Sequence, residues 1–223
     1  MSGYGTVRIG TGAPAISLAE LVDTVTELPE ERLNLETLRD LVDRVVLRRS
    51  MLEQHTKFCG EMYARHLLCR TSRLEALCLN WKPGQRTIIH NHGGSFGALQ
   101  VCQGELQTEL FARVDDGRVP GHAVVEERRK MVNGEDAVGE VHLGDIHRQG
   151  NASATKDLVT VHFYIRPLTY IDVFDVKRQT LQTVGLRYCL GEARCAVVVP
   201  GGEGPCIRKT PIPIELENRP RPL

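Results

Sequence analysis

Two histidines separated by one residue, His90 and His92, are the strongest sign of chemistry in this sequence. Side chains on an extended strand repeat with a period of two, so both imidazoles should lie on one face. The pair stands between Gly84 and Gly104, and a third histidine, His147, follows in a second glycine-containing segment. No carboxylate occurs in the five residues after His92. We therefore expect a metal site made of three neutral histidines.

The ligand set leaves the identity of the metal open. Three neutral imidazoles do not offset the charge of a divalent ion, so the site should attract anionic ligands. Imidazole binds iron, copper, nickel and zinc alike. A single His-x-His pair is often incidental, but the glycine frame and the third histidine favour a metal here. The other histidines have no partner at ligand spacing, so we expect surface or packing roles for them: His55, His66, His122 and His142. For His142, a contact that supports the ligand His147 is the alternative.

Composition narrows the class of protein. Among 223 residues, 28 Lys and Arg balance 28 Asp and Glu, which gives no electrostatic attraction to nucleic acid or to an anionic membrane. No apolar run approaches the length of a transmembrane helix, and residues 1–12 lack the pattern of a signal peptide. Seven cysteines without CxxC spacing favour a reducing compartment over a disulfide framework. We expect a cytoplasmic monomer that binds neither nucleic acid nor membrane.

The hydrophobic pattern changes from helical to strand-like near residue 74. Residues 17–28 and 35–49 follow helical spacing, and 51–66 is compatible with a further helix. Short apolar runs separated by turn residues follow, which is typical of a β-sandwich or β-barrel. The expected strands are 74–81, 87–92, 98–103, 106–112, 119–125, 138–143, 158–165 and 170–175.

The expected strand 158–165 has one apolar face and one polar face that carries no charge. Thr160, His162 and Tyr164 share the polar face because they alternate along the strand. In a small barrel this face would line an interior pocket, whereas on a half-exposed edge strand it would meet water. The metal site expected nearby favours the pocket.

Four separated segments together resemble the cysteine dioxygenase family of cupins. They are Tyr63-Ala64-Arg65, the frame Gly84–Gly104, the segment Gly144–Asn151 and the run Thr160–Tyr164. The resemblance extends over roughly residues 15–180. It implies a mainly β fold, a cupin-type β-barrel (jelly-roll) with two or three N-terminal α-helices.

A single cupin domain over residues 1–223 is the organisation that we expect. Its N-terminal part, residues 1–70, should be helical, and residues 74–180 should form the β-barrel with the metal site. Residues 181–223 should add C-terminal strands and a proline-rich tail.

The resemblance also implies roles for the metal-site and substrate-site residues. His90, His92 and His147 are then the ligands of Fe(II). Arg65 holds the carboxylate of the substrate through its bidentate fork, and Tyr63 lies in the same substrate-binding segment.

A polar relay completes the implied site. Tyr164 is the phenol near the iron, and His162 and Thr160 continue its hydrogen-bonded chain, with Thr in the place of the family's usual Ser. Tyr164 and His162 also belong to the substrate-binding set. A phenol near bound oxygen can donate a hydrogen bond to developing negative charge.

Two positions depart from the family pattern. The animal enzymes carry a cysteine that forms a thioether with the tyrosine, and Gly97 stands there in this chain, so the resemblance is to the bacterial type without that cross-link. The family often has Ser-Pro-Pro after the tyrosine, and this chain has Ile165-Arg166-Pro167. Arg166 is then either a second carboxylate partner or, as we expect, a solvated arginine.

The expected function is oxidation of L-cysteine with O2 to cysteine sulfinate. Oxidation of another small thiol such as 3-mercaptopropionate is an alternative, although relatives that prefer that substrate tend to carry Gln where Arg65 stands. A non-catalytic metal-binding cupin is a second alternative, and a cupin isomerase or hydrolase with another metal is a third. The combination of His90, His92, His147 and Tyr164 favours the dioxygenase.

Overall fold

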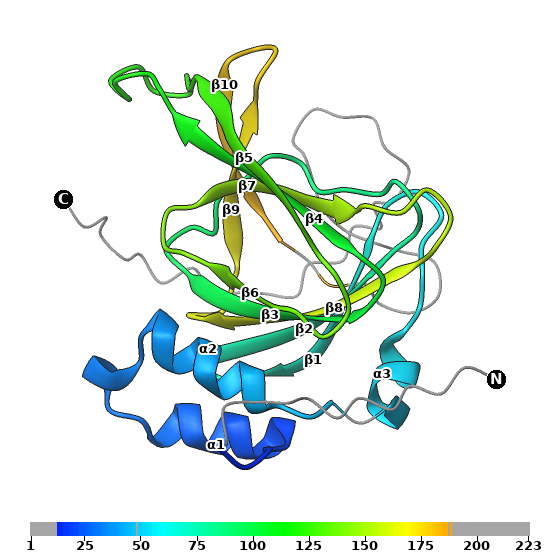
Figure 1. Ribbon diagram of the computed structural model, residues 1–223. Coiled ribbons are helices and arrows are strands. Elements are labelled where there is room, and N and C mark those ends of the chain that lie inside the picture. The colour runs from blue at the N-terminus through cyan, green and yellow to red at the C-terminus, as the bar shows by residue number, and fades with distance from the viewer. Residues whose placement is uncertain (1–12, 48, 187, 189–223) are drawn as a thin grey trace, which may run out of the picture.

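The computed structural model describes residues 13–47, 49–186 and 188 of the chain. In this part of the chain, three short α-helices come first and ten strands follow (Figure 1). No helix among the described residues is long and apolar enough to cross a membrane. The helices are α1 (Leu18–Glu27), α2 (Leu35–Arg44) and α3 (Arg49–His55). The strands are β1 (Ala64–Arg70), β2 (Leu74–Trp81), β3 (Phe96–Gln103), β4 (Leu106–Arg113), β5 (Val125–Asn133), β6 (Val138–Val141), β7 (Ile146–Asn151), β8 (Leu158–Ile165), β9 (Tyr170–Asp175) and β10 (Thr180–Gly185).

One wall of the barrel is a five-stranded sheet with the order β1-β2-β8-β3-β6. Strand β8 lies at its centre, paired antiparallel with β2 and with β3. The outer face of β8, which includes Val161 and Phe163, packs in one apolar cluster with the N-terminal helices. On the inner face Thr160, His162 and Tyr164 are buried. This face is therefore interior, and the edge-strand alternative is wrong.

The opposite wall is assembled from two smaller sheets, β5-β4-β7 and β10-β9. An extended segment, residues 85–91, lies between β7 and β9 and joins them. On one side the His90 N–H donates to the His147 carbonyl at 2.9 Å, and on the other the Asn91 N–H donates to the Asp172 carbonyl at 3.0 Å. The segment therefore closes the second wall without forming a regular strand itself.

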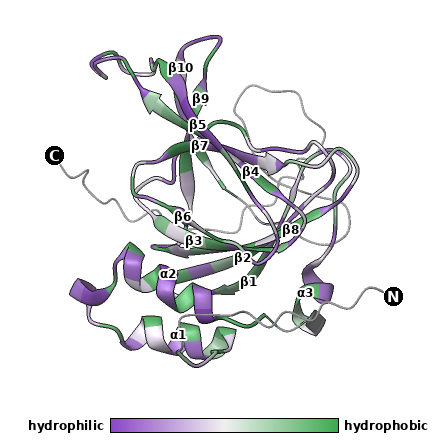
Figure 2. Cartoon of the chain, in the orientation of Figure 1, coloured by the Kyte–Doolittle hydropathy of each residue, from purple (hydrophilic) through white to green (hydrophobic). Residues whose placement is uncertain are grey.

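The helices cover the outer face of the five-stranded sheet (Figure 1). Helix α1 begins at a capping box between Ser17 and Glu20, and α2 begins where the Asn34 side chain accepts the Thr37 N–H. Figure 2 shows hydrophobic and hydrophilic residues alternating along both helices, so each presents one apolar stripe to the sheet. The helical residues buried in this contact are Leu21, Val25, Leu38, Leu41 and Val42.

The predicted architecture, a mainly β cupin-type barrel with two or three N-terminal helices, is confirmed. Expected strands 74–81, 158–165 and 170–175 match β2, β8 and β9. Strand β10 fits the expectation of strands after residue 180, while the proline-rich tail lies outside the described residues.

The N-terminal part departs from the prediction in two places. Helix α2 ends at Arg44, short of the expected residue 49. The expected helix over 51–66 is wrong in its second half, because α3 ends at His55 and Ala64–Arg70 form β1. Hydrogen bonding along β2 decides the conformation of β1, and such tertiary pairing overrides local propensity. Residues 1–70 are therefore not helical throughout.

Three barrel segments also need correction. Residues 87–92 form isolated bridges and no regular strand. The expected strand 119–125 is wrong, because the strand in this region is β5, Val125–Asn133. Strand β7 was not expected at all. Strand β5 is an edge strand with five consecutive exposed residues after Val125, and β7 is mostly polar. Neither has the apolar alternation on which strand prediction depends.

Gln100 on β3 links the sheet to the end of α2. Its side-chain amide is almost fully buried and donates to the backbone carbonyls of Val42 and Val45. Replacing Gln100 with Leu removes both hydrogen bonds and leaves the Val42 carbonyl with only the Val45 N–H as donor, so we expect a loss of about 1–3 kcal/mol in the free energy of unfolding. Urea denaturation measures this loss. Gln182→Leu, at an exposed position of β10, is the control and should change stability by less than about 0.5 kcal/mol. Equal midpoints for both variants would contradict the role of Gln100.

Candidate metal centre

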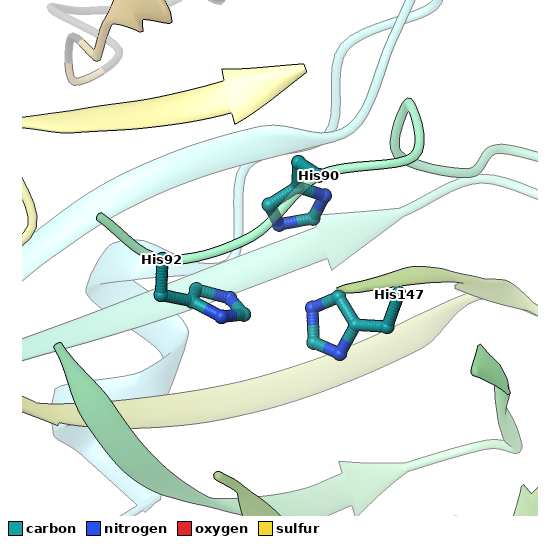
Figure 3. Close-up of side chains that lie close together, drawn as sticks. All are labelled: His90, His92 and His147. Atoms are coloured by element: carbon teal, nitrogen blue, oxygen red, sulfur yellow. The ribbon is translucent and has the colours of Figure 1, made fainter. Parts of the chain in front are cut away.

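The three histidines predicted as ligands meet in the second wall. His90 lies in the extended segment 85–91 and His92 directly after it, both between β2 and β3, and His147 lies on β7. The backbones of His90 and His147 are joined in both directions, with N–H to carbonyl distances of 2.9 and 2.8 Å. Their three imidazoles point toward one another (Figure 3), and the candidate ligand nitrogens all lie within 4.8 Å of one another. The expectation of three clustered histidines is confirmed.

Hydrogen bonding leaves nitrogens available for a metal. The Nδ1–H of His90 donates to the Ile88 carbonyl at 2.9 Å, which directs its Nε2 atom away from that bond. Both ring nitrogens of His92 and the Nε2 atom of His147 are buried without a hydrogen-bond partner among the described residues. Buried polar atoms are almost always paired, and a ligand from outside the chain would supply the missing partner. A divalent metal ion fits this donor set.

The protonation state of the histidines also fits a metal. Burial is the main cause that lowers the pKa of His90 to about 4, and it lowers the pKa values of His92 and His147 well below 6.5. The imidazoles are therefore neutral at neutral pH. Histidine must be neutral to ligate a metal, so no proton has to be displaced.

A hydrogen-bonded chain runs along the inner face of β8, in the first wall. The Nε2 atom of His162 lies 2.9 Å from Thr160 Oγ1, and its Nδ1 atom lies 3.2 Å from the Tyr164 hydroxyl. The indole N–H of Trp81 donates to Thr160 Oγ1 at 3.1 Å. The relay expected from the resemblance is thus present as a continuous chain of contacts.

Trp81 indicates the direction of that chain. Indole is a donor only, so it occupies one lone pair of Thr160, and one assignment that satisfies the whole chain has the Thr160 hydroxyl donating to His162 Nε2. Burial lowers the pKa of His162 to about 3, so the neutral ring carries one proton, which in this assignment lies on Nδ1 and is donated to Tyr164. The hydroxyl proton of Tyr164 is then available to a ligand.

Tyr164 brings this chain to the metal histidines. Its ring stacks on the His92 ring with centroids 5.4 Å apart, so the two walls meet at this contact. Burial raises the pKa of Tyr164 far above its usual value, opposed in part by the charge of Arg65. The phenol therefore stays protonated and can act as a donor.

Arg65 lies on β1, and only 5% of its surface is exposed. Its positive charge adds to burial in lowering the pKa values of His90 and His162, which indicates that it lies close to both. Tyr63, two residues earlier, stacks on Trp81 at 4.3 Å between ring centroids. Arg65 therefore lies near His90 and His162, and Tyr63 packs on Trp81, the partner of Thr160.

Gly97 and Arg166 can now be placed. Gly97 pairs directly with Tyr164, and a Cβ atom at Gly97 would lie 2.8 Å from the tyrosine ring. Position 97 therefore faces Tyr164, and it holds no sulfur. Arg166 is exposed, and its guanidinium contacts the Gly94 carbonyl at 3.5 Å. This agrees with a solvated arginine. His142 is exposed and pairs with Glu140, so it does not support His147.

Trp81 is the site residue that the sequence analysis missed. It is the only tryptophan of the chain and ends the strand 74–81, which was expected correctly. Alternation along that strand places Trp81 on the same face as Leu77 and Leu79, which pack in the interior cluster. Alternation in the sequence could therefore have placed Trp81 on the interior face, but nothing in the sequence pairs this strand with Thr160.

Comparisons with known proteins agree with this site. The model of the family "Cysteine dioxygenase type I" matches residues 10–177. The chain is similar to cysteine dioxygenase type 1 of Danio rerio, with 25% identity over 77% of this chain and 86% of that one. It is also similar to cysteine dioxygenase type 1 of Homo sapiens, with 26% identity over 71% and 79%.

A solved structure of an uncharacterized Klebsiella pneumoniae protein with a double-stranded β-helix domain is also similar. It has 12% identity and a TM-score of 0.42, over 54% of this chain and 84% of that one, a likeness too distant to bear on function. The family match spans both walls of the barrel and all three clustered histidines. The chain therefore belongs to the cysteine dioxygenase type I family and is a thiol dioxygenase.

Proposed function

We propose that this protein oxidises L-cysteine with O2 to cysteine sulfinate at a site that holds Fe(II) through His90, His92 and His147. The observation that carries the proposal is the set of unpaired, buried imidazole nitrogens facing Tyr164 and Arg65 across the barrel. Both oxygen atoms of O2 are added to the sulfur of the substrate.

The donor set supports a redox-active metal with an anionic ligand. Bound iron supplies the redox chemistry toward O2 and a positive charge that favours the thiolate form of the substrate. Among the described residues no carboxylate belongs to the histidine cluster, so the charge of the ion is not offset by the protein.

Arg65 is proposed to bind the carboxylate of the substrate. Its guanidinium is permanently charged and offers a planar fork that matches a carboxylate. It lies on the first wall, near His90 and Tyr164, while the histidines occupy the second. A small molecule with a carboxylate at one end and a thiol at the other fits between these two groups. Tyr63, packed on Trp81, forms part of the same pocket wall.

Tyr164 is proposed to donate its hydroxyl proton to the reacting atoms. His162 and Thr160 hold the phenol through the chain that ends at Trp81. A fixed donor aimed at developing negative charge stabilises the transition state without reorganisation. Burial of all three groups excludes water from this face of the pocket.

The alternative substrate is another small thiol carboxylate such as 3-mercaptopropionate. Arg65 would serve either molecule, since both carry a carboxylate. Membership of the family favours an enzyme over the non-catalytic metal-binding cupin and over an isomerase or hydrolase. Oxygen consumption measured across a panel of small thiols, with analysis of the bound metal, distinguishes these candidates.

The cellular setting is also proposed from the sequence. A cytoplasmic monomer without nucleic-acid or membrane partners agrees with the balanced charge of the chain. Cys69 and Cys78 are free thiols within the described part of the chain, as expected in a reducing compartment.

The metal prediction concerns His147. His147→Ala removes one of three ligands and should strip most of the iron and the activity, because two imidazoles alone hold the ion weakly. Elemental analysis of the purified variant measures the iron content. His142→Ala, at the exposed histidine nearby, should keep both. Stoichiometric iron in His147→Ala would remove that residue from the site.

The substrate prediction compares two arginines. Arg65→Ala should raise the KM for cysteine strongly, through loss of a charge-assisted pair that contributes about 1.5–3 kcal/mol. Arg166→Ala should change the KM much less, because Arg166 is exposed. Steady-state oxygen consumption gives both values. Reversed effects would place the carboxylate at the other end of the pocket and weaken the case for cysteine.

The tyrosine prediction separates catalysis from metal binding. Tyr164→Phe should retain iron but lose rate, since removal of one preorganised donor can raise the barrier by about 2.7–4 kcal/mol. The wild-type protein should run as one homogeneous band on a denaturing gel before and after turnover, because Gly97 offers no sulfur for a cross-link to Tyr164. Turnover by Tyr164→Phe at the wild-type rate would reduce Tyr164 to a packing residue. A Tyr164–Cys peptide lighter by two hydrogens would contradict the second expectation.

A further inference from the structure

Tyr188, which follows β10, reaches back to the first wall of the barrel. Its hydroxyl donates to the Glu75 carboxylate and accepts a hydrogen bond from the Arg70 guanidinium. Burial and the contact with Glu75 raise its pKa to about 12, so the hydroxyl stays protonated. The ring packs against the interior apolar cluster that also contains Tyr164 and Leu168. A residue outside the regular strands is therefore attached to the wall that carries the relay.

Glu75 is the anchor of this contact. It is a fully buried carboxylate on β2, and its direct partner on β8 is Tyr164. Its two oxygens are used by the Tyr188 hydroxyl, by Arg70 at 3.5 Å and by the Leu168 N–H at 3.1 Å. A buried carboxylate is costly unless it is paired in this way. Glu75 therefore holds the Tyr188 hydroxyl in one position.

A bulge in β1 brings two arginines to the same face. Arg70 pairs with Glu75 and Arg65 pairs with Leu79, and a register shift lies between Leu67 and Cys69. Glu75 and Leu79 are four residues apart on β2 and share its inner face, so their partners on β1 share that face as well. Arg70 can then hold the hydroxyl of Tyr188 while Arg65 lies beside its ring.

The ring of Tyr188 lies next to the arginine of the substrate pocket. The guanidinium carbon of Arg65 is 5.9 Å from the ring centroid, within the range of a cation–π contact. An arginine held against an aromatic face loses less conformational freedom when it binds a carboxylate. Glu75 and Arg70 thereby act on Arg65 indirectly, through the position of the ring.

We propose that Tyr188 is a positioning residue of the substrate pocket, held by Glu75 and Arg70, whose ring orients the Arg65 guanidinium toward the carboxylate of the substrate. This inference rests on the proposed function, since it assigns Arg65 to the carboxylate. It makes Tyr188 a determinant of affinity for thiols that carry a carboxylate. Thiols without one should not depend on Tyr188.

The test compares two variants of Tyr188 in the iron-loaded enzyme. Tyr188→Leu removes the ring and should raise the KM for cysteine about tenfold, with kcat within a factor of about two, from loss of the cation–π contact. Tyr188→Phe keeps the ring but loses its hydroxyl anchor, and should raise the KM about threefold. Phe111→Leu is the matched control, because it removes a ring 6.0 Å from the Arg148 guanidinium in the other wall. It should leave the KM unchanged.

A binding measurement separates positioning from general damage to the fold. The single tryptophan, Trp81, stacks on Tyr63 in the pocket, so its fluorescence reports binding in oxygen-free solution. Tyr188→Leu should weaken binding of cysteine about tenfold and leave binding of cysteamine, which has no carboxylate, unchanged. Equal weakening for both thiols would show a structural role and overturn the inference.

The outcomes also separate this inference from the proposed function. Wild-type protein that consumes no oxygen with cysteine would overturn the proposed function, and the inference with it. Wild-type turnover together with an unchanged KM in Tyr188→Leu would overturn the inference alone. If Tyr188→Leu does not fold, Tyr188→Phe decides, and an unchanged KM in that variant would overturn the inference.

Discussion

The two-way backbone pairing between His90 and His147 is the interaction on which the rest of this structure depends. It joins the extended segment 85–91 to β7, and the same segment pairs with β9 on its other side. The same segment is also held to β7 by the Thr87 N–H, which donates to the Gln149 carbonyl, and by the Asn151 N–H, which donates to the Gln85 carbonyl. Because the paired residues are themselves candidate metal ligands, the hydrogen bonds that close the barrel also set the spacing of the imidazoles. The same hydrogen bonds therefore contribute to closing the barrel and to placing the histidines.

The first wall supplies a second constraint, through the two unlike faces of β8. Its outer face packs against α1 and α2 through apolar contacts, so the orientation of the strand and of its inner face is fixed. Thr160, His162 and Tyr164 are then held opposite the three clustered histidines. Trp81, from the neighbouring strand, completes their hydrogen bonding. The helices far from the chemistry therefore determine where the phenol lies.

Polar groups in this interior fall into two kinds. Those of the relay and the Glu75 anchor are hydrogen-bonded to one another, as burial requires. Those of His92 and His147 have no hydrogen-bond partner within the part of the chain that the structure describes, although burial makes this costly. The difference marks where a ligand from outside the chain belongs. Neutral imidazoles, a protonated phenol and a charged arginine give a pocket suited to a small anion.

Residue types and spacing predicted part of this site. The His-x-His pair with His147 and the alternating polar face of 158–165 indicated a metal site beside an interior face, because period-two alternation and ligand chemistry act locally. The thiol dioxygenase function and the role of Arg65 were implied by the resemblance of four segments to the cysteine dioxygenase family. Strands with clear apolar alternation were placed correctly for the same reason. The apolar stripes of α1 and α2 likewise follow from local spacing.

Only the tertiary structure decided how these pieces meet. Strands β1, β5 and β7 were missed or misplaced because their conformation comes from pairing with distant strands and not from their own pattern. The contact of Trp81 with Thr160 and that of Tyr188 with Glu75 join residues far apart in sequence. Local periodicity determines which face of a strand a side chain occupies, whereas long-range hydrogen bonding decides which faces share one pocket.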